Sequence, residues 1–249
     1  GGLPVAITDC LNFGSPETEN GQYQLVQAVA GIRDACDAFG IPVISGNVSL
    51  YNEASAGAIY PTPVIGAMGI LDDVQKHASA GFAGDGDAVY LLGTGSLDGD
   101  AATLAGSEYL DVFVGRLVGQ PALDLDLEVK SQTACRDGIV AGLISSAHDV
   151  SDGGLAVSLA EAAILGGRGV VVDAGIGGRW DAALFGEAQS RIIVTVPVGR
   201  TDDFEKTAEN AGAPTLRIGV TGGDRIVISD LGDVALSDAA DSWNSGFDT

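Results

Sequence analysis

Two short polar segments near the start of the chain carry residue types suited to binding a phosphate and a divalent cation. The first is T-D-C-L-N-F-G, residues 8–14, in which the apolar run 4–7 leads directly into Asp9. This pattern predicts a buried strand that delivers the carboxylate at its end, where open α/β sheets place their ligands. The alternative is that Asp9 caps the turn that follows.

The second segment is S-G-N-V-S-L-Y-N-E, residues 45–53, and it also follows an apolar run. Gly46 lets the backbone approach a phosphate, Asn47 offers a carbonyl oxygen to a hard cation, and Ser49 offers a hydroxyl. An ordinary polar turn is the alternative. Because loops that end successive strands lie side by side, we predict that Asp9 and this loop form one nucleotide-phosphate and Mg²⁺ site.

A third segment, S-S-A-H-D-V-S-D-G-G-L at residues 145–155, leads into a predicted helix. Asp149 and Asp152 could bind a metal or cap the helix, and Gly153 and Gly154 expose backbone N–H groups where anions are favoured. His148 stands beside Asp149 and resembles an acid/base pair, although such neighbouring pairs are more often structural.

A fourth segment, L-F-G-E-A-Q-S-R at residues 184–191, precedes a predicted strand. Glu187, Gln189 and Arg191 alternate along it, so in an extended chain they would point to one side. The pattern alone favours a solvated edge.

The elements that position the first two segments follow the order strand, helix, strand. Apolar residues recur at helical spacing over residues 22–39, Gly40 is a candidate left-handed cap, and Pro42 prevents continuation. Residues 41–44 and 63–70 are the next predicted strands. Periodicity is lost over residues 72–86, so we place a domain boundary near residue 82.

The remainder of the chain predicts a second α/β unit. Its predicted strands are residues 88–92, 170–172, 192–196 and 225–228, and residues 155–165 are a predicted helix. Residues 123–129 alternate apolar and acidic side chains, which fits a strand or the acidic first turn of a helix that runs toward residue 143. We favour the helix.

Composition and charge exclude several classes of protein. The 249 residues are 46% hydrophobic and 18% charged, which indicates a globular chain. The net charge of −22 disfavours nucleic acid and anionic membrane surfaces as partners, and it means that a phosphate ligand needs cations. No apolar run is long enough to span a bilayer, and no signal peptide begins the chain, which predicts a cytoplasmic location. The three cysteines are expected to be reduced.

The order of the four segments, together with P-T-P-V-I-G at 61–66 and G-S-E-Y at 106–109, resembles phosphoribosylformylglycinamidine synthase. The similarity is greatest to the later half of its synthetase subunit, within the aminoimidazole ribonucleotide synthetase-like superfamily. The resemblance implies an α/β (α+β) fold, with a partial N-type α/β domain at residues 1–82 and a C-type α/β domain at 83–249.

What this family does is an ATP-dependent amidation in purine synthesis, in which formylglycinamide ribonucleotide is activated by phosphorylation and ammonia displaces the phosphate. By motif match, Asp9 and Gly46 fall on ATP-contacting positions, Asn47 on a Mg²⁺ ligand and Ser49 on a substrate contact.

The same resemblance places further residues around a pseudo-symmetric second site, which holds a nucleotide without turnover in some members: His148, Asp149, Asp152, Gly153, Gly154, Glu187, Gln189 and Arg191.

The resemblance also implies partners and an incomplete site. The implied partners are the N-terminal half of the same synthetase, a glutaminase subunit and a small bridging subunit. Because the family's catalytic residues lie in the earlier half, we expect this chain to be a fragment that holds no catalytic residue and is inactive alone. Strand edges left exposed would favour a homo-oligomer. The alternatives are a nucleotide-binding or architectural module without chemistry, or a relative such as aminoimidazole ribonucleotide synthetase.

Overall fold

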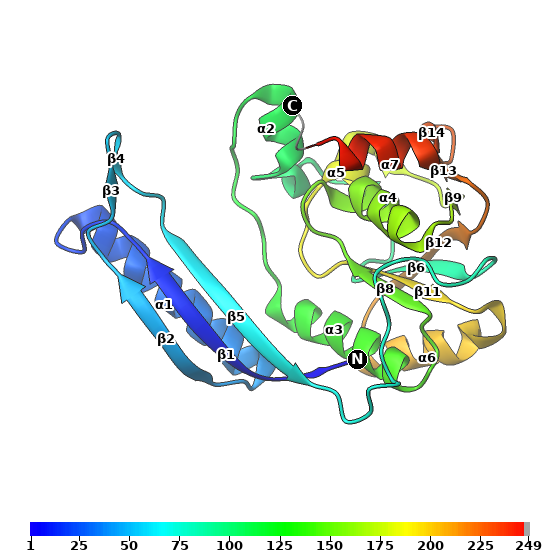
Figure 1. Cartoon of the computed structure of the whole chain (residues 1–249), viewed down its shortest axis with the longest axis horizontal. Helices are drawn as coiled ribbons and strands as arrows, with labels where there is room; N and C mark the ends of the chain where they lie inside the picture. Colours follow the sequence, from blue (N-terminus) through cyan, green and yellow to red (C-terminus); the bar gives the residue numbers. More distant parts are fainter. Residues whose placement is uncertain (247–249) are drawn as a thin grey trace. The chain divides into compact units, whose positions relative to one another are not determined.

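The first unit of the computed structural model spans Gly2–Asp73 and is built on a three-stranded sheet. The sheet order is β2-β1-β5, where β1 is Leu3–Asn12, β2 is Val43–Ser49 and β5 is Thr62–Ile70. β1 pairs in parallel with β2 and antiparallel with β5, and α1 (Glu19–Phe39) runs alongside this sheet (Figure 1). A short hairpin, β3 (Glu53–Ala54) and β4 (Gly57–Ala58), follows β2. The structure describes residues 1–246.

Helix α1 confirms the predicted helix and begins three residues earlier than the periodicity indicated. The Thr18 hydroxyl accepts the Gly21 N–H and caps the first turn. At the other end Gly40 has φ 64° and donates its N–H to the Cys36 carbonyl. The left-handed conformation suits glycine, and the proline two residues later removes the next helical N–H.

The prediction that residues 45–49 form a loop is wrong, because they belong to β2. Asp9 likewise does not end its strand, since β1 continues to Asn12. β2 is an edge strand of this sheet, and all of its residues are exposed. Gly, Asn and Ser are poor strand formers in a sheet interior, but an exposed edge imposes no packing requirement on them. The polar sequence therefore hid the strand.

The second unit contains a seven-stranded sheet whose order is β14-β13-β9-β12-β6-β11-β8. Its strands are β6 (Ala88–Leu92), β8 (Ser146–Asp149), β9 (Val170–Val172), β11 (Ile192–Val196), β12 (Thr215–Thr221), β13 (Arg225–Ile228) and β14 (Gly232–Ala235). The longer helices are α3 (Leu125–Val140), α4 (Gly154–Gly166), α6 (Thr201–Ala211) and α7 (Leu236–Asn244). The short elements are β7 (Asp98–Gly99), η1 (Ala101–Leu104), α2 (Glu108–Val114), β10 (Gly177–Gly178), α5 (Trp180–Phe185) and η2 (Val198–Arg200).

Helices cover both faces of this sheet, so its interior strand β6 is buried along its whole length. Val89 and Leu91 pack into the core beneath α4, whereas Tyr90 and Leu92 pack into the core that contains Ala134 of α3 and Phe204 of α6. Successive side chains point to opposite faces of a strand, and burial on both faces explains a run with no polar residue.

The predicted strands 88–92, 170–172, 192–196 and 225–228 are confirmed, and the predicted helix at 155–165 is α4. The ambiguous segment 123–129 enters helix α3. Its first turn is capped by the Asp124 carboxylate, which accepts the N–H groups of Asp126 and Leu127.

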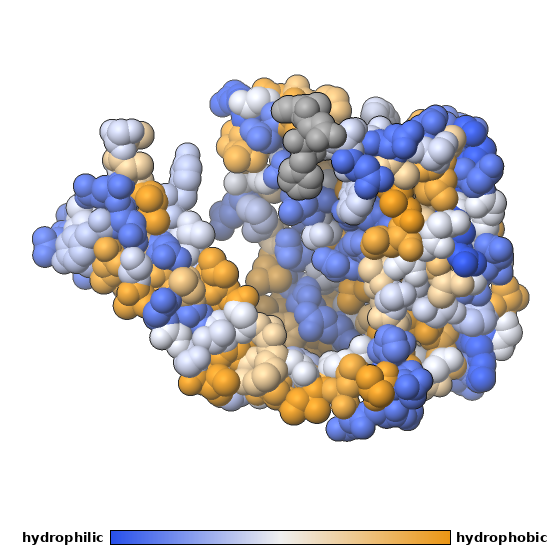
Figure 2. Space-filling view, viewed as in Figure 1, coloured by the Kyte–Doolittle hydropathy of each residue, from blue (hydrophilic) through white to orange (hydrophobic). Residues whose placement is uncertain are grey.

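The compact units divide between Asp73 and Val74, whereas the sequence placed a domain boundary near residue 82, and that boundary stays a prediction. Figure 2 shows apolar residues gathered over the strands of the first unit, where the exposed side chains include Ile44, Val48, Val64 and Met68. None of the helices described within residues 1–246 has the length and apolar character needed to cross a bilayer.

Candidate functional site

Asp9 and Gly46 lie opposite each other in the parallel pair of β1 and β2. A Cβ added to Gly46 would lie 2.1 Å from Asp9 Oδ1 and 2.6 Å from Asp9 Cγ. The carboxylate therefore occupies the space that any other residue at position 46 would fill. This contact gives Gly46 a role that the sequence did not indicate, because the glycine makes room for the Asp9 side chain.

The polar side chains predicted to complete this site lie on the other face of the same two strands. Thr8 and Ser45 hydrogen-bond through their hydroxyl oxygens at 2.8 Å, so both point to one face. Strand alternation puts Asn47 and Ser49 on the Thr8 face and puts Asp9 on the opposite face. The two segments are adjacent as predicted, but their functional side chains diverge.

The turns that follow β1 and β2 are tied together by hydrogen bonds. Phe13 donates its N–H to the Ser49 carbonyl at 3.0 Å, and Tyr51 donates its N–H to the Gly14 carbonyl at 3.1 Å. Tyr51 has φ 60°, an unusual left-handed conformation for a large residue, and its hydroxyl donates to Glu17 at 3.2 Å. That contact raises the pKa of Tyr51. These hydrogen bonds therefore hold the turn that follows the polar residues of β2.

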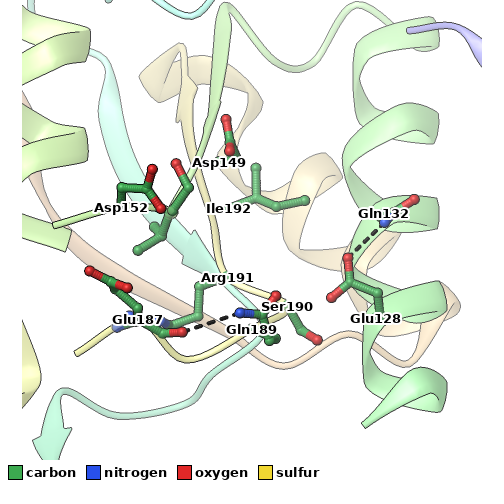
Figure 3. A pocket seen from close by; sticks show the side chains of 11 residues that line it. Glu128, Gln132, Asp149, Asp152, Glu187, Gln189, Ser190, Arg191 and Ile192 are labelled. Carbon is green, nitrogen blue, oxygen red and sulfur yellow. Dashed lines mark hydrogen bonds between the residues drawn. The ribbon is translucent and has the colours of Figure 1, made fainter. Parts of the chain in front are cut away.

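A second group of predicted residues surrounds a cavity of about 520 Å³ in the second unit (Figure 3). Its wall contains Asp149, Asp152, Glu187, Gln189 and Arg191. These residues come from the end of β8, the turn before α4 and the segment before β11, and the structure places them around one cavity; their role in a second nucleotide site stays a prediction. Glu128 and Gln132 of α3 also line the cavity, and sequence reasoning missed both.

Glu187 joins the beginnings of two helices. Its Oε1 accepts the N–H of Gly153, the residue before α4, at 2.8 Å and the N–H of Glu108, the first residue of α2, at 2.9 Å. Both N–H groups belong to helix N-termini, which favour an anion. The prediction that Gly153 and Gly154 expose free N–H groups to a ligand is therefore wrong, since Gly154 donates its N–H to the Ser151 carbonyl.

The Arg191 guanidinium is largely buried at the wall of the cavity and pairs with backbone carbonyl groups. Nε donates to the Ala188 carbonyl at 3.2 Å, and a terminal nitrogen donates to the Gly186 carbonyl. Burial lowers the pKa of Arg191 to about 10. Its neighbour Ser190 has φ 70°, and the Ser190 carbonyl lies 2.0 Å from the position of a Cβ on Gly93. These contacts fix the segment that carries Gln189 and Arg191.

His148 does not line the cavity. Its side chain is 11% exposed, and Nδ1 lies 2.7 Å from the Asp149 carbonyl oxygen. Nε2 lies 3.6 Å from Glu161 of α4 and Nδ1 lies 3.7 Å from the Asp149 carboxylate. The imidazole thus joins β8 to α4, which is the structural interpretation of the His-Asp pair.

Metal-ligating side chains do not converge in the described part of the chain. Within residues 1–246, no group of three or more His, Cys, Asp or Glu side chains is placed to hold a metal ion. Asn47 is exposed at the edge of the sheet, and its amide oxygen is a hard donor of the kind that Mg²⁺ accepts. A cation at Asn47 would have to take its other ligands from phosphate oxygens, water or another part of a larger site.

The chain matches the AIR synthase related proteins in two parts. Their N-terminal domain matches residues 1–71, and their C-terminal domain matches residues 84–230. The sequence is 46% identical over 250 residues to the phosphoribosylformylglycinamidine synthase subunit PurL of Thermomicrobium roseum, and 44% identical over 256 residues to that of Anaeromyxobacter sp.. Each alignment covers 99% of this chain and 33% of the relative, so the chain spans about a third of the length of the curated relatives that it matches.

Solved structures show the same fold. Thermotoga maritima PurL complexed with FGAR superposes with a TM-score of 0.72 at 17% identity, over 96% of this chain and 40% of that one. The hydrogenase maturation protein HypE superposes with a TM-score of 0.64 at 18% identity, over 95% of this chain and 77% of that one. These identities establish the fold alone.

Proposed function

The chain belongs to the AIR synthase related family, and from this premise we propose that it supplies part of the site of a PurL-type phosphoribosylformylglycinamidine synthase. The 46% identity to the Thermomicrobium roseum subunit over nearly the whole chain carries this proposal. The reaction is the ATP-dependent conversion of formylglycinamide ribonucleotide and ammonia to the amidine, with glutamine as the source of ammonia. Thermotoga maritima PurL has been solved with ATP and with FGAR, which supports these two ligands.

Each side of the sheet has a separate role in this proposal. Asp9 and Gly46 form the ATP-contacting part of the site on one face, where Gly46 acts by making room for the Asp9 carboxylate, while Asn47 binds Mg²⁺ and Ser49 contacts the ribonucleotide on the other. β2 is the edge strand, so a ligand bound along it can reach residues of both faces. Mg²⁺ would neutralise phosphate charge, and the chain's net charge of −22 increases the need for such a cation.

The cavity in the second unit favours the architectural alternative for that region. Glu187 already occupies the N–H groups at which an anion would bind, and Asp149 and Asp152 would repel phosphate. We therefore propose that the second-site residues bind a nucleotide only as its Mg²⁺ complex, or serve the fold alone.

The proposed partners are the remainder of the synthetase, a glutaminase subunit and a bridging subunit, and the proposed location is the cytoplasm. A PurLQS assembly from Thermotoga maritima contains a chain of this fold, which supports the subunit partners. The chain is proposed to hold no catalytic residue and to be inactive alone.

The test combines the chain with the part of the Thermomicrobium roseum subunit that it does not match, and measures amidation with ammonia, ATP and formylglycinamide ribonucleotide. We expect activity only in the mixture, and Asp9→Ala and Asn47→Ala to reduce it at least about tenfold, since each removes a contact to a charged group. Ser45→Ala is the matched control on β2, because its hydroxyl pairs with Thr8. Equal rates for Asn47→Ala and Ser45→Ala would refute the site assignment.

A further inference from the structure

The side chain of Asn52 joins the ends of the two strands that carry the proposed site. Its Nδ2 donates to the Phe13 carbonyl at 3.1 Å and to the Ser49 carbonyl at 2.9 Å. The Asn52 backbone N–H also donates to the Phe13 carbonyl at 3.1 Å. The residue is half-buried, whereas Ser49 is exposed. One side-chain amide therefore contacts both strand ends, in addition to the backbone hydrogen bonds that join them.

These contacts also fix which way the amide faces. Only the NH₂ group can donate to two carbonyl oxygens, so the amide oxygen must face Ser49 Oγ, from which it lies 3.1 Å. An amide oxygen only accepts hydrogen bonds. The Ser49 hydroxyl must therefore donate its single proton to Asn52, and it is left with lone pairs toward solvent.

We propose that Asn52 is a positioning residue that presents the Ser49 hydroxyl as a hydrogen-bond acceptor. Ser49 then selects a donor on its ligand, such as a ribose hydroxyl or an amide N–H, and does not bind the ligand's phosphate. The inference rests on the proposed function for the assignment of Ser49 to the ribonucleotide substrate, but the orientation of the hydroxyl rests on the structure of this chain.

The turn between Ser49 and Asn52 is held independently of the amide. Tyr51 keeps its left-handed conformation through its N–H bond to Gly14 and its hydroxyl bond to Glu17. Gly14 leaves no room for a side chain, since a Cβ there would lie 2.7 Å from the Cβ of Ala58. Removal of the Asn52 side chain should therefore free the Ser49 hydroxyl without dismantling the turn.

The first experiment needs only this chain. In nuclear magnetic resonance, the side-chain NH₂ protons of Asn52 should exchange with solvent at least about tenfold more slowly than those of the exposed Asn20, because two carbonyls hold them. Ser49→Ala should shift the Asn52 resonances and leave those of Asn20 in place. Fast exchange of Asn52, or resonances insensitive to Ser49→Ala, would overturn the proposal whether or not the enzyme activity is found.

The second experiment is a double-mutant cycle in the complemented enzyme described above. Ser49→Ala and Asn52→Ala should each raise KM for formylglycinamide ribonucleotide about tenfold and change KM for ATP less than about twofold. The double variant should be no worse than either single variant. Multiplying effects would show that Asn52 does not act through Ser49, and would overturn the proposal.

Two further variants separate positioning from folding. Asn244→Ala is the matched control, because its amide also donates to a backbone carbonyl, that of Ala240, but it belongs to the second unit, whereas Ser49 belongs to the first. It should leave both KM values unchanged even if the melting temperature falls. Asn52→Asp keeps an oxygen that can accept from Ser49 but replaces the NH₂ group by a carboxylate oxygen that faces the Phe13 and Ser49 carbonyls, so it should raise KM for the ribonucleotide as Asn52→Ala does. An unchanged KM in Asn52→Asp would show that the NH₂ bonds do not position the residue, and would contradict the proposal.

The substrate itself distinguishes a donor from a phosphate at Ser49. The Ser49→Ala penalty should persist when the ribonucleotide is replaced by its dephosphorylated nucleoside. A penalty that disappears with the phosphate would place the phosphate at Ser49 and overturn the assignment. If the unmodified mixture has no activity, the proposed function fails, and the exchange experiment still decides the orientation of the hydroxyl.

Discussion

Replacing Gly46 by alanine tests whether this glycine exists to make room for Asp9. Gly46 is absent from the residues with positive φ, so an alanine can adopt its backbone conformation. The added Cβ, however, would lie 2.1 Å from Asp9 Oδ1 and 3.0 Å from the Asp9 carbonyl oxygen. Because a carboxylate is the flexible end of its side chain, we expect it to rotate away while the strands stay paired.

The two free-energy terms for the fold nearly cancel. Alanine in place of glycine gains about 0.5–1 kcal/mol through lower entropy of the unfolded chain. An Asp9 side chain displaced from its preferred rotamer costs about 0.5–1.5 kcal/mol. The free energy of unfolding should therefore change by less than about 1 kcal/mol. Losing a hydrogen bond that the Asp9 carboxylate accepts from the nucleotide costs about 1.5–3 kcal/mol, which raises KM for ATP at least about tenfold.

The assay compares thermal unfolding of the chain with KM for ATP in the complemented enzyme. Gly31→Ala in α1 is the matched control, because a Cβ there meets nothing within 4 Å, and it should leave KM unchanged. In an Asp9→Ala background, Gly46→Ala should have no further effect. If Gly46→Ala raises KM in that background too, the glycine acts through its own backbone and the reasoning about space is refuted.

The remaining predictions concern the second unit and the thiols. Burial raises the pKa of Cys135 from 9.0 to about 11, so the folded state holds the thiol proton more tightly than the unfolded state does. The contribution of this pKa difference to the free energy of unfolding is complete below about pH 9 and is lost as the pH rises toward 11. Cys135→Ala should flatten the alkaline fall in stability measured by denaturant titration, and iodoacetamide should modify Cys10 and Cys36 before Cys135 in the folded chain. Glu187→Ala should lower the free energy of unfolding by about 2 kcal/mol, because two backbone N–H groups lose a charged acceptor. Glu128→Ala is the control, because it removes only an exposed hydrogen bond from the Gln132 amide, and it should lower the free energy of unfolding by at most about 0.5 kcal/mol. Equal destabilisation by the two variants would contradict this account of Glu187.

The sequence predicted the elements whose ends carry capping residues or whose side chains are buried on both faces. Helix α1 is bounded by a Thr18 cap and by Gly40, and each acts within four residues of the helix end. The buried strands of the second unit were visible because burial on both faces demands an unbroken apolar run, as in β6. Residues 45–49 were not predicted as a strand, because they lie in an edge strand and carry polar side chains, so they form no apolar run.

Long-range contacts could not be predicted in the same way. Glu187 meets Gly153 and Glu108, which lie 34 and 79 residues away along the chain, and no spacing in the sequence relates them. The structure forms no disulfide among Cys10, Cys36 and Cys135, and their reduced state stays a prediction. The site roles of Asp9, Gly46, Asn47 and Ser49 stay predictions, since the fold shows where these residues lie and not what they bind.

The alternation of a β-strand changes what the motif S-G-N-V-S can mean. In a loop, all five residues could surround one phosphate, and Gly46 would be needed for close backbone approach. In an edge strand, Gly46 and Asn47 point to opposite faces, so the glycine serves the Asp9 carboxylate behind the sheet while Asn47 and Ser49 face the front. A one-residue insertion between Gly46 and Asn47 would turn Asn47 and Ser49 to the Asp9 face, and should abolish Mg²⁺-dependent activity even if the strand still pairs with β1. The motif therefore presents different residues on the two faces of an edge strand, and the alternation of side chains along the strand decides which residues share a face.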